Sequence, residues 1–297
     1  MKLNIKAILV TIGCSAALAG CKSTPETVEP IPFSNESSYA YNIANQTVLT
    51  RNNSPLRDFT REEEAEISQK VDKATGGDVS MLIGGLKLLT LDLTGIIDVA
   101  GGAVSNLADR SHPAGSFHWL IEVDDADFSS EKEAQDYILG TLDKATVELL
   151  SQYGVVSKNS VREGFFTYMV NHNGKQISFG GLQRNSARPG MLVKRDYRIH
   201  SNSNADTYTY GISKSDYLLN DYLVGPVSPL AYAVESKNEV DLDGFYKSLT
   251  SKLPNGFYLY TPSLPQYTVD KLTYTDYDQV LPAIYTQGKK YEFIKPE

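Results

Sequence analysis

The turn dipeptide Asn173-Gly174 constrains the fold of this chain most. It separates two runs, "GFFTYMV" and "KQISFGG", in which apolar and polar residues alternate. Alternation with a period of two is typical of β-strands, and Asn-Gly suits the positive φ angles of a two-residue hairpin turn. Gln287-Gly288 stands between similar runs near the C-terminus and predicts a second hairpin. Both hairpins require antiparallel pairing.

Helical patterns lie between these strands. Thr60 followed by Glu63, and Ser130 followed by Glu133, are capping boxes that predict the starts of two helices. A shorter helix is expected near 243–252. The run "SFHWLIEVD" alternates and predicts a strand just before the second capping box. We therefore expect an α+β fold with a mainly antiparallel sheet and about three to four helices.

The most apolar run after the first twenty residues covers residues 80–110 and contains paired glycines. It is long enough to span a bilayer, but it contains Lys87, Asp92 and Asp98, and each central charge costs about 2.5 to 3.5 kcal/mol on insertion. On a helical wheel its leucines share one face. The pattern predicts a long Gly-rich amphipathic helix near 79–109 that packs in the core, or, as an alternative, a helix that forms oligomers or lies on a membrane.

The first twenty residues begin with Lys2 and Lys6, continue through an apolar stretch and end on small residues, which is typical of a secretory signal. Their end, Leu18-Ala19-Gly20-Cys21, resembles the lipobox of bacterial lipoproteins. The resemblance implies that residues 1–20 are removed and that Cys21 carries diacylglycerol and fatty acyl chains such as palmitate, with the lipid bilayer as its partner. Because Lys22 rather than Asp follows the cysteine, it also implies the outer membrane of the cell envelope.

The rest of the chain divides by composition. Residues 21–58 are polar and contain three prolines near their start, which predicts a lipidated cysteine followed by a flexible tether. Residues 59–297 are expected to form the α+β globular region. The loop-like run 185–190 can divide it into a helical and β N-terminal part and a tyrosine-rich β C-terminal part.

Charge and cysteine content exclude several classes of function. The chain has 28 basic and 36 acidic residues, and its net charge of −8 argues against a nucleic-acid partner. Cys14 lies in the signal and Cys21 is assigned to lipid, so the mature chain has no thiol for a disulfide, a metal site or a nucleophile. Its stability must therefore come from a buried core.

Motifs for catalysis or metal binding are weak. We find no G-x-S-x-G, phosphate-binding glycine loop or H-E-x-x-H. Ser129 and Lys132 have the spacing of serine-lysine acyl enzymes, but the start of a helix explains both. The run 239–244 is similar to the front of a calcium loop, yet Thr250 stands where the closing carboxylate belongs. The four histidines, none of which is paired at metal-ligand spacing, are His112, His118, His172 and His200. We expect no metal, no cofactor and no catalytic residue.

Tyrosine is the remaining signal, since 14 of the 19 tyrosines follow residue 190. A tyrosine ring offers a flat apolar face and a hydroxyl group, which suits recognition of a glycan or a protein. The binding residues predicted from their alternation on strands are Tyr208, Tyr210, Tyr258 and Tyr260. The expected function is that of an envelope lipoprotein acting as a non-catalytic binding or assembly component, with an envelope protein or glycan as partner. The alternatives are an envelope hydrolase acting on glycan or peptide, and an oligomer-forming or membrane-active protein that uses the helix at 80–110.

Overall fold

The computed structural model describes residues 31–50, 56–75, 81–83, 86–89, 113–162, 165–183, 192–199, 204–211 and 227–297. Its α-helices are α1 (Tyr39–Ala44), α2 (Arg61–Thr75), α5 (Glu131–Leu150), α6 (Leu230–Ser236) and α7 (Leu242–Ser251), with short 3-10 helices η1 (Val48–Thr50), η2 (Pro113–Gly115) and η3 (Asp125–Asp127). Its strands are β1 (Met81–Ile83), β2 (Leu86–Leu89), β3 (His118–Asp124), β4 (Val155–Arg162), β5 (Phe165–His172), β6 (Lys175–Gln183), β7 (Val193–Tyr197), β8 (Asn204–Tyr210), β9 (Phe257–Thr261), β10 (Gln266–Val269), β11 (Leu272–Asp276), β12 (Ala283–Thr286) and β13 (Lys289–Glu292).

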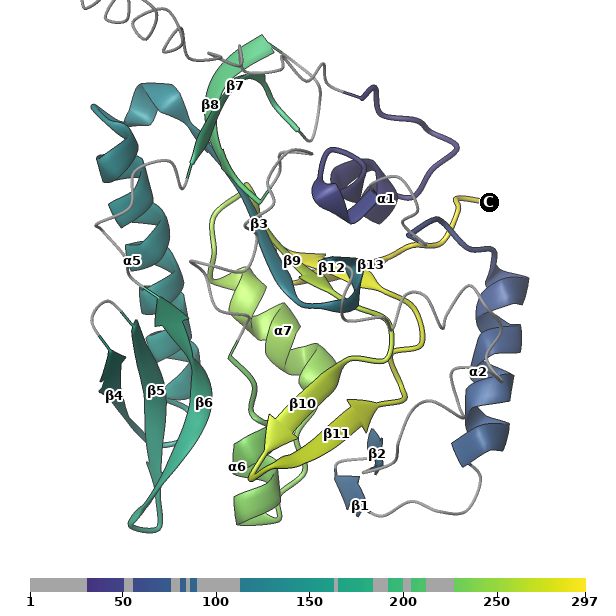
Figure 1. Cartoon of the computed structure of the whole chain (residues 1–297), viewed down its shortest axis with the longest axis vertical. Helices are drawn as coiled ribbons and strands as arrows, with labels where there is room; N and C mark the ends of the chain where they lie inside the picture. Colours follow the sequence, from purple (N-terminus) through teal and green to yellow (C-terminus); the bar gives the residue numbers. More distant parts are fainter. Residues whose placement is uncertain are drawn as a thin grey trace, which may run out of the picture.

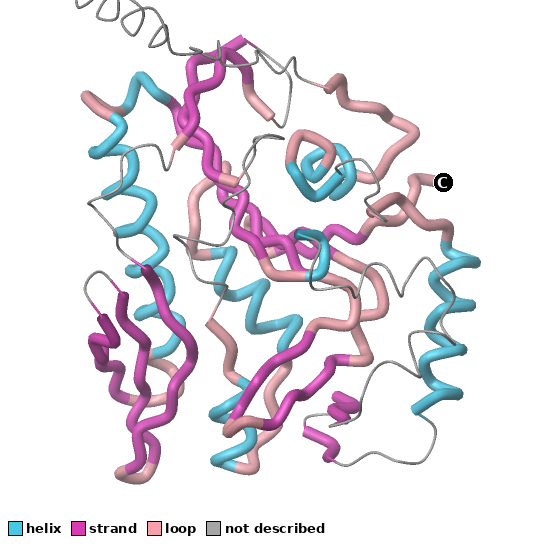
Figure 2. Tube along the Cα trace, in the orientation of Figure 1, coloured by secondary structure: helices cyan, strands magenta, loops and turns pink. Residues whose placement is uncertain are grey.

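The strands form three sheets, with orders β13-β12-β9-β3-β8-β7, β1-β2-β11-β10 and β4-β5-β6. Every described strand pair within them is antiparallel. Figure 2 shows these strands in magenta between the helices, which are cyan. The prediction of an α+β fold with a mainly antiparallel sheet is confirmed.

Strand β3 lies inside the six-stranded sheet and is buried on both faces. Trp119 and Ile121 belong to a core that includes α5 and α7, whereas Leu120 belongs to a second core that includes α1 and α2. The helices accordingly lie on opposite sides of the sheet (Figure 1). Because successive strand side chains point to opposite faces, one alternating run supplies both cores.

Helix α5 begins where its capping box predicts. The Glu133 N–H group donates to Ser130 Oγ at 3.3 Å, and Glu133 Oε2 accepts the Ser129 N–H group at 2.8 Å. The apolar stripe expected from the sequence is buried along the helix: Ala134, Ile138, Leu142, Ala145 and Leu149. All five residues of this stripe belong to the larger core, which also contains residues of β5 and β6.

Both predicted hairpins are present. Asn173 and Gly174 have φ angles of 50° and 80° between β5 and β6, and Gln287 and Gly288 have φ angles of 50° and 73° between β12 and β13. The predicted short helix is α7. Here local sequence and tertiary structure agree because the turn residues tolerate the required positive φ angles.

The helix predicted near 79–109 is wrong from Met81 to Leu89, where the chain forms β1 and β2. Ile83 pairs with Leu86, so only the dipeptide Gly84-Gly85 connects the two strands. β2 in turn pairs with β11, through Leu89 and Thr275. A helical wheel cannot reveal this distant partner, whereas a glycine pair between short apolar runs is a hairpin signal. Residues 90–109 lie outside the described residues.

The tether predicted for residues 21–58 is too long at its C-terminal end. Helix α1 and the residues after it are packed into the second core, where Ile43 and Leu49 are fully buried. The buried Asp58 carboxylate accepts hydrogen bonds from the Ser38 N–H group at 2.7 Å and from Ser38 Oγ at 2.6 Å. The few apolar residues of this polar stretch converge once α1 forms, so the folded part includes residues 31–50. Cys21 and the lipobox lie outside the described residues.

The boundary expected at 185–190 does not separate two sheets. β3, which precedes it, lies between β9 and β8, which follow it, in one hydrogen-bonded sheet. The run itself lies outside the described residues. Among the residues that are described, no helix has the length and apolarity needed to cross a membrane.

Two glycine substitutions should change stability in opposite directions. Gly140 lies inside α5, and a Cβ added there meets no heavy atom within 4 Å. Gly140→Ala should therefore raise the free energy of unfolding by about 0.5–1 kcal/mol, because alanine loses less backbone entropy in a helix. Gly256 has a φ of 88°, and its added Cβ would overlap the Glu122 carbonyl oxygen. Gly256→Ala should lower stability. Urea unfolding measures both, and the packing described for these positions is contradicted if the two changes have the same sign.

Candidate functional site: a groove between two sheet edges

The tyrosines predicted to bind a ligand are inside the protein. Tyr208, Tyr210, Tyr258 and Tyr260 are 5%, 3%, 3% and 0% exposed. The first two belong to the core on the α5 side of the central sheet and the last two to the core on the α1 side, so the sheet separates them. The prediction of a tyrosine-lined binding surface therefore does not hold for these residues. It fails because both faces of their strands are covered, which alternation alone does not show.

The two described histidines, His118 and His172, both contact other side chains or backbone groups of the protein. His118 is buried, its Nε2 lies 2.5 Å from the Pro113 carbonyl oxygen, and its ring stacks on Tyr260 at 6.2 Å. His172 lies beside the β5–β6 turn with its ring 5.0 Å from that of Tyr232. His112 and His200 lie outside the described residues. Within the described part of the chain, no group of three or more His, Cys, Asp or Glu side chains could hold a metal ion.

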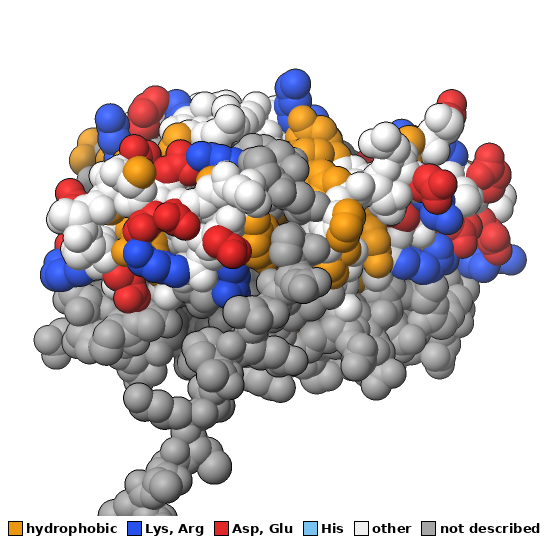
Figure 3. Space-filling model, turned by 90° about the horizontal axis from the view of Figure 1, so that it is seen from above, with side chains coloured by type: hydrophobic (Ala, Val, Ile, Leu, Met, Phe, Trp, Pro, Cys, Tyr) orange, Lys and Arg blue, Asp and Glu red, His pale blue; other side chains and the backbone are white. Residues whose placement is uncertain are grey.

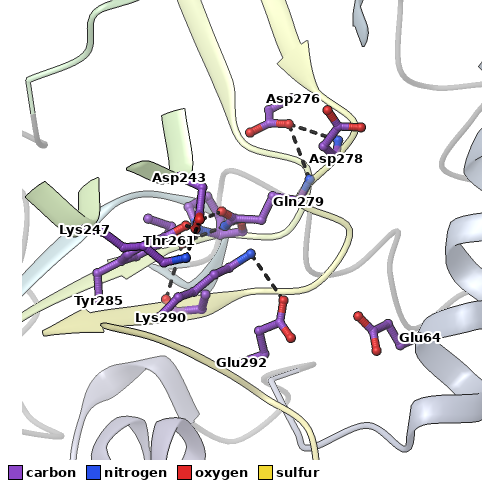
Figure 4. Close-up of polar contacts among 12 residues, drawn as sticks. Glu64, Asp243, Lys247, Thr261, Asp276, Asp278, Gln279, Tyr285, Lys290 and Glu292 are labelled. Atoms are coloured by element: carbon purple, nitrogen blue, oxygen red, sulfur yellow. Dashed lines mark hydrogen bonds and ion pairs between the residues drawn. The ribbon is translucent and has the colours of Figure 1, made fainter. Parts of the chain in front are cut away.

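A polar cluster that the sequence analysis missed connects α7, β9 and β12 (Figure 4). The Tyr285 hydroxyl lies 3.0 Å from Asp243 Oδ1 and 3.2 Å from Gln279 Oε1, and both oxygens can accept its proton. Gln279 Nε2 donates to Thr261 Oγ1 at 2.6 Å and to the Pro262 carbonyl oxygen at 3.0 Å. These bonds fasten the loop after β11 to the central sheet.

Asp276 at the end of β11 is buried next to this cluster. Its Oδ1 accepts the backbone N–H groups of Asp278 at 2.9 Å and Gln279 at 3.3 Å, which is an Asx-type turn. Burial raises the pKa of the Asp276 carboxyl to about 6, against the lowering effect of these two hydrogen bonds. A carboxyl with a raised pKa is a general feature of active sites. Asp276 does not line either of the cavities described below, and its hydrogen bonds explain it as a loop anchor.

An acidic cleft of about 800 Å³ lies at the start of α5, near the ends of β3 and β7. Its charged lining residues include Asp124, Glu133, Asp136 and Arg198. Arg198 forms an ion pair with Asp124, Lys132 Nζ lies 2.5 Å from Asp136, and the Ser129 hydroxyl lowers the pKa of the Glu133 carboxyl by donating to it. In the coloured part of the face seen in Figure 3, acidic and basic side chains likewise lie next to one another. These partners, together with the helix N-terminus, account for Asp124, Glu133 and Asp136.

A second cavity, of about 510 Å³, lies between the edges of two sheets, and we call it the β6–β10 groove. One wall is β6, the last strand of the three-stranded sheet, and the other is β10, the last strand of the four-stranded sheet. Helix α6 contributes Leu230, Ala231 and Glu235 to the lining, and β5 contributes Met169. Figure 1 shows α6 between the two strands at the lower end of the molecule.

Local sequence explains the limits of each wall. β6 starts after the Asn173-Gly174 turn. β10 ends at Val269 and is followed by another tight turn, in which Asp270 and Lys271 have φ angles of 50° and 70°. α6 follows Pro229 and ends at Lys237, which has a left-handed φ of 57°. Buried Leu230 packs with Val269 of β10 in a small core under the groove. The walls are thus held by hairpins and by a helix that packs on β10.

The groove is predominantly polar at its rim. Lys175 at the start of β6 forms an ion pair of 2.5 Å with Glu235 of α6. Gln176 and Ser178 of β6 and Thr268 of β10 are exposed, while Ile177 and Val269 are turned inward and buried. Exposed polar positions therefore alternate with buried apolar ones on both walls, as expected for half-buried strands. The sequence showed the alternation, but it could not show that the two edges face each other.

Comparisons with known protein families, with curated proteins and with solved structures found no match.

The raised pKa of Asp276 should make stability depend on pH. The folded-state pKa of about 6 exceeds the unfolded value of about 3.9, so the folded protein binds more protons between these values. Stability should fall as pH rises from 4 to 6, by at most about 3 kcal/mol, and the contribution should level off above pH 6. Asp276→Asn keeps an acceptor oxygen and removes the charge, so it should flatten this part of the curve.

Urea unfolding at pH 4, 5, 6 and 7 measures the effect. Asp270→Asn is the matched control, because its side chain is exposed and Asp270 is not among the groups that shift the pKa of Asp276, so the substitution should leave the pH slope unchanged. An unaltered slope in Asp276→Asn would show that other groups produce the pH dependence.

Proposed function

We propose that this chain is a lipoprotein anchored through Cys21 in the outer membrane of a bacterial envelope, and that its folded domain is a non-catalytic binding or assembly component that holds a partner in the β6–β10 groove. The proposal that the domain binds a partner is supported by the groove itself, a cavity bounded by two sheet edges. The observation that carries the anchor is the run Leu18-Ala19-Gly20-Cys21 at the end of a signal-like segment.

Covalent geometry limits how far the domain can lie from its anchor. The first described residue is Ile31, ten residues after Cys21. An extended chain spans at most about 3.6 Å per residue, so the lipid and the domain are separated by no more than about 36 Å. Two or three acyl chains are sufficient for stable attachment. The proposed anchor would therefore keep the domain close to the membrane surface.

The groove and the first described residues, which begin at Ile31, lie at opposite ends of the molecule. In Figure 1 the purple chain leading into α1 is at the upper end, whereas β6, α6 and β10 meet at the lower end. A domain tethered by the residues before α1 would present the groove away from the bilayer. This arrangement favours a partner in the aqueous phase over a role for the groove in lipid binding.

The lining of the two described cavities favours binding over hydrolysis. A hydrolase of the carboxylate type needs an acid with a raised pKa at the cleft. Asp276 has such a pKa but lies outside both linings, and the pKa of Glu133 in the acidic cleft is lowered. The groove offers hydrogen-bonding backbone edges and apolar side chains, which are the groups that a binding site uses.

Replacement of the proposed lipid site tests the anchor. Cys21→Ala should abolish labelling by a palmitate analogue and move the protein from the membrane fraction to the soluble fraction, because no thiol would remain near the mature N-terminus. Cys14→Ala is the matched control, since Cys14 lies in the removed signal, and it should leave both readouts unchanged. Persistence of Cys21→Ala in washed membranes would overturn the assignment.

Site-specific photo-crosslinking tests the groove in intact cells. A photoreactive phenylalanine at Gln176, an exposed lining residue, should give one adduct of reproducible mass, because a bound partner would lie within reach of the side chain. The same replacement at exposed Glu62 of α2, outside the groove lining, should give none. Identical adduct patterns from both positions, or no adduct from Gln176, would contradict a partner in the groove.

A further inference from the structure

We propose that the partner bound in the β6–β10 groove is an extended polypeptide segment of another protein, neutral or basic in charge, which adds to the edge of β6 as a further antiparallel or parallel strand. This assignment rests on the proposed binding function and names the class of ligand for the same groove. Strand addition is a general mode of peptide recognition in which main-chain hydrogen bonds provide affinity.

Backbone geometry directs part of β6 into the groove. The two-residue turn between His172 and Lys175 makes these residues a hydrogen-bonded pair. Antiparallel pairing alternates hydrogen-bonded with non-hydrogen-bonded pairs. Ile177 is therefore turned toward β5, whereas the N–H and C=O groups of Gln176 and Ser178 point away from β5. Both residues line the groove, so we infer that these outward backbone groups are available to a ligand bound there.

The chain itself already uses one end of this edge. The Ser228 N–H group donates to the Phe179 carbonyl oxygen at 2.8 Å, which is a strand-like bond to β6. At Pro229 the chain leaves the edge and enters α6. The register shift between β5 and β6 also lies near this end, while pairing is regular from Lys175 to Ser178. An incoming strand would continue the ladder along the regular part, which at about 3.3 Å per residue is about 10 Å long.

The opposite wall offers a second strand edge. β10 is the outer strand of its sheet, and Tyr267, Thr268 and Val269 line the groove. Side chains on one side of a bound strand would point toward Leu230 and Ala231 of α6, and those on the other side toward solvent. The site would therefore favour small apolar residues at every second position of the ligand.

Charge selects against an acidic ligand. Among the lining residues Lys175 is balanced by its ion pair with Glu235, and Asp270 on the β10 side is left as the excess charge. An acidic side chain near Asp270 would be repelled, whereas a basic one would be attracted. This complementarity is the reason for assigning a neutral or basic segment.

An extended segment fits these walls better than a helix or a compact ligand. A helix satisfies its own backbone groups, so it would leave the edge groups of β6 buried without partners. The outer strand β4 of the same sheet is, by contrast, protected: it has a register shift at its end and carries Lys158 and Arg162. Charged residues and irregular pairing are common means of blocking strand addition. The regular edge of β6 is therefore the better docking site.

A displayed library of random twelve-residue peptides, selected on the full-length mature lipoprotein in detergent, tests the proposal. Selected peptides should show alternating small apolar residues and few acidic ones. Ser178→Pro removes one outward N–H group and should weaken their binding about tenfold, the loss of one hydrogen bond worth about 1–1.5 kcal/mol. Ser160→Pro places the same residue at an exposed position of β4, at the other edge of this sheet and outside the groove lining, and is the matched control, which should bind as the unmodified protein does.

N-methylation of the selected peptides provides a second measurement that needs no protein variant, so it decides the question even if Ser178→Pro does not fold. Methylation at alternate residues should abolish binding in one of the two alternate sets and leave it in the other. Equal tolerance at every position, or full binding to folded Ser178→Pro, would overturn strand addition, as would the enrichment of no peptide.

Two further outcomes separate this inference from the proposed function. A concentration-dependent dimer that Ser178→Pro abolishes would identify a second copy of this chain as the occupant and overturn the assignment to another protein. A crosslink from Gln176 with peptides indifferent to N-methylation would leave groove binding intact and remove only the strand geometry.

Discussion

The burial of β3 on both faces is the constraint on which the rest of the structure depends. Its odd-numbered side chains complete the core with α5 and α7, and Leu120 completes the core with α1 and α2. The alternate side also carries Glu122, which is 4% exposed and would be costly to bury without a partner. The Ile199 N–H group donates to Glu122 Oε2 at 2.6 Å, so this carboxylate fastens the chain after β7 to the centre of the sheet.

The groove is a consequence of how the outer sheets attach to this centre. Residues of β5 and β6 pack on α5 in the larger core, and β10 and β11 pack with α6 in a small core of their own. Each outer sheet therefore ends in a strand that the central sheet does not cover. Hairpins and a packed helix hold both edges, so the walls are strands and a helix rather than loops. A bound segment would therefore meet a preformed surface.

Most of the described tyrosines in the C-terminal half are buried in the interior. Tyr260 Oη donates to the Ala114 carbonyl oxygen at 2.7 Å, and Tyr285 reaches Asp243 and Gln279. A buried tyrosine needs such a partner for its hydroxyl, while its ring supplies a large apolar surface. The alternation of these residues is therefore explained by two covered sheet faces. A binding surface would produce the same alternation, which is why the sequence pattern could not distinguish the two.

Local signals in the sequence determined the antiparallel hairpins at Asn173-Gly174 and Gln287-Gly288, the start of α5 and its buried stripe, because turns and caps depend on neighbouring residues alone. Contacts between distant residues decided the rest. Pairing of β2 with β11 made strands of a run whose periodicity favours a helix, and packing in the second core ordered α1 within a polar stretch. Likewise, only the tertiary structure placed the edges of β6 and β10 opposite each other. The two strands are far apart in the sequence, so no pattern of neighbouring residues predicts that they face each other.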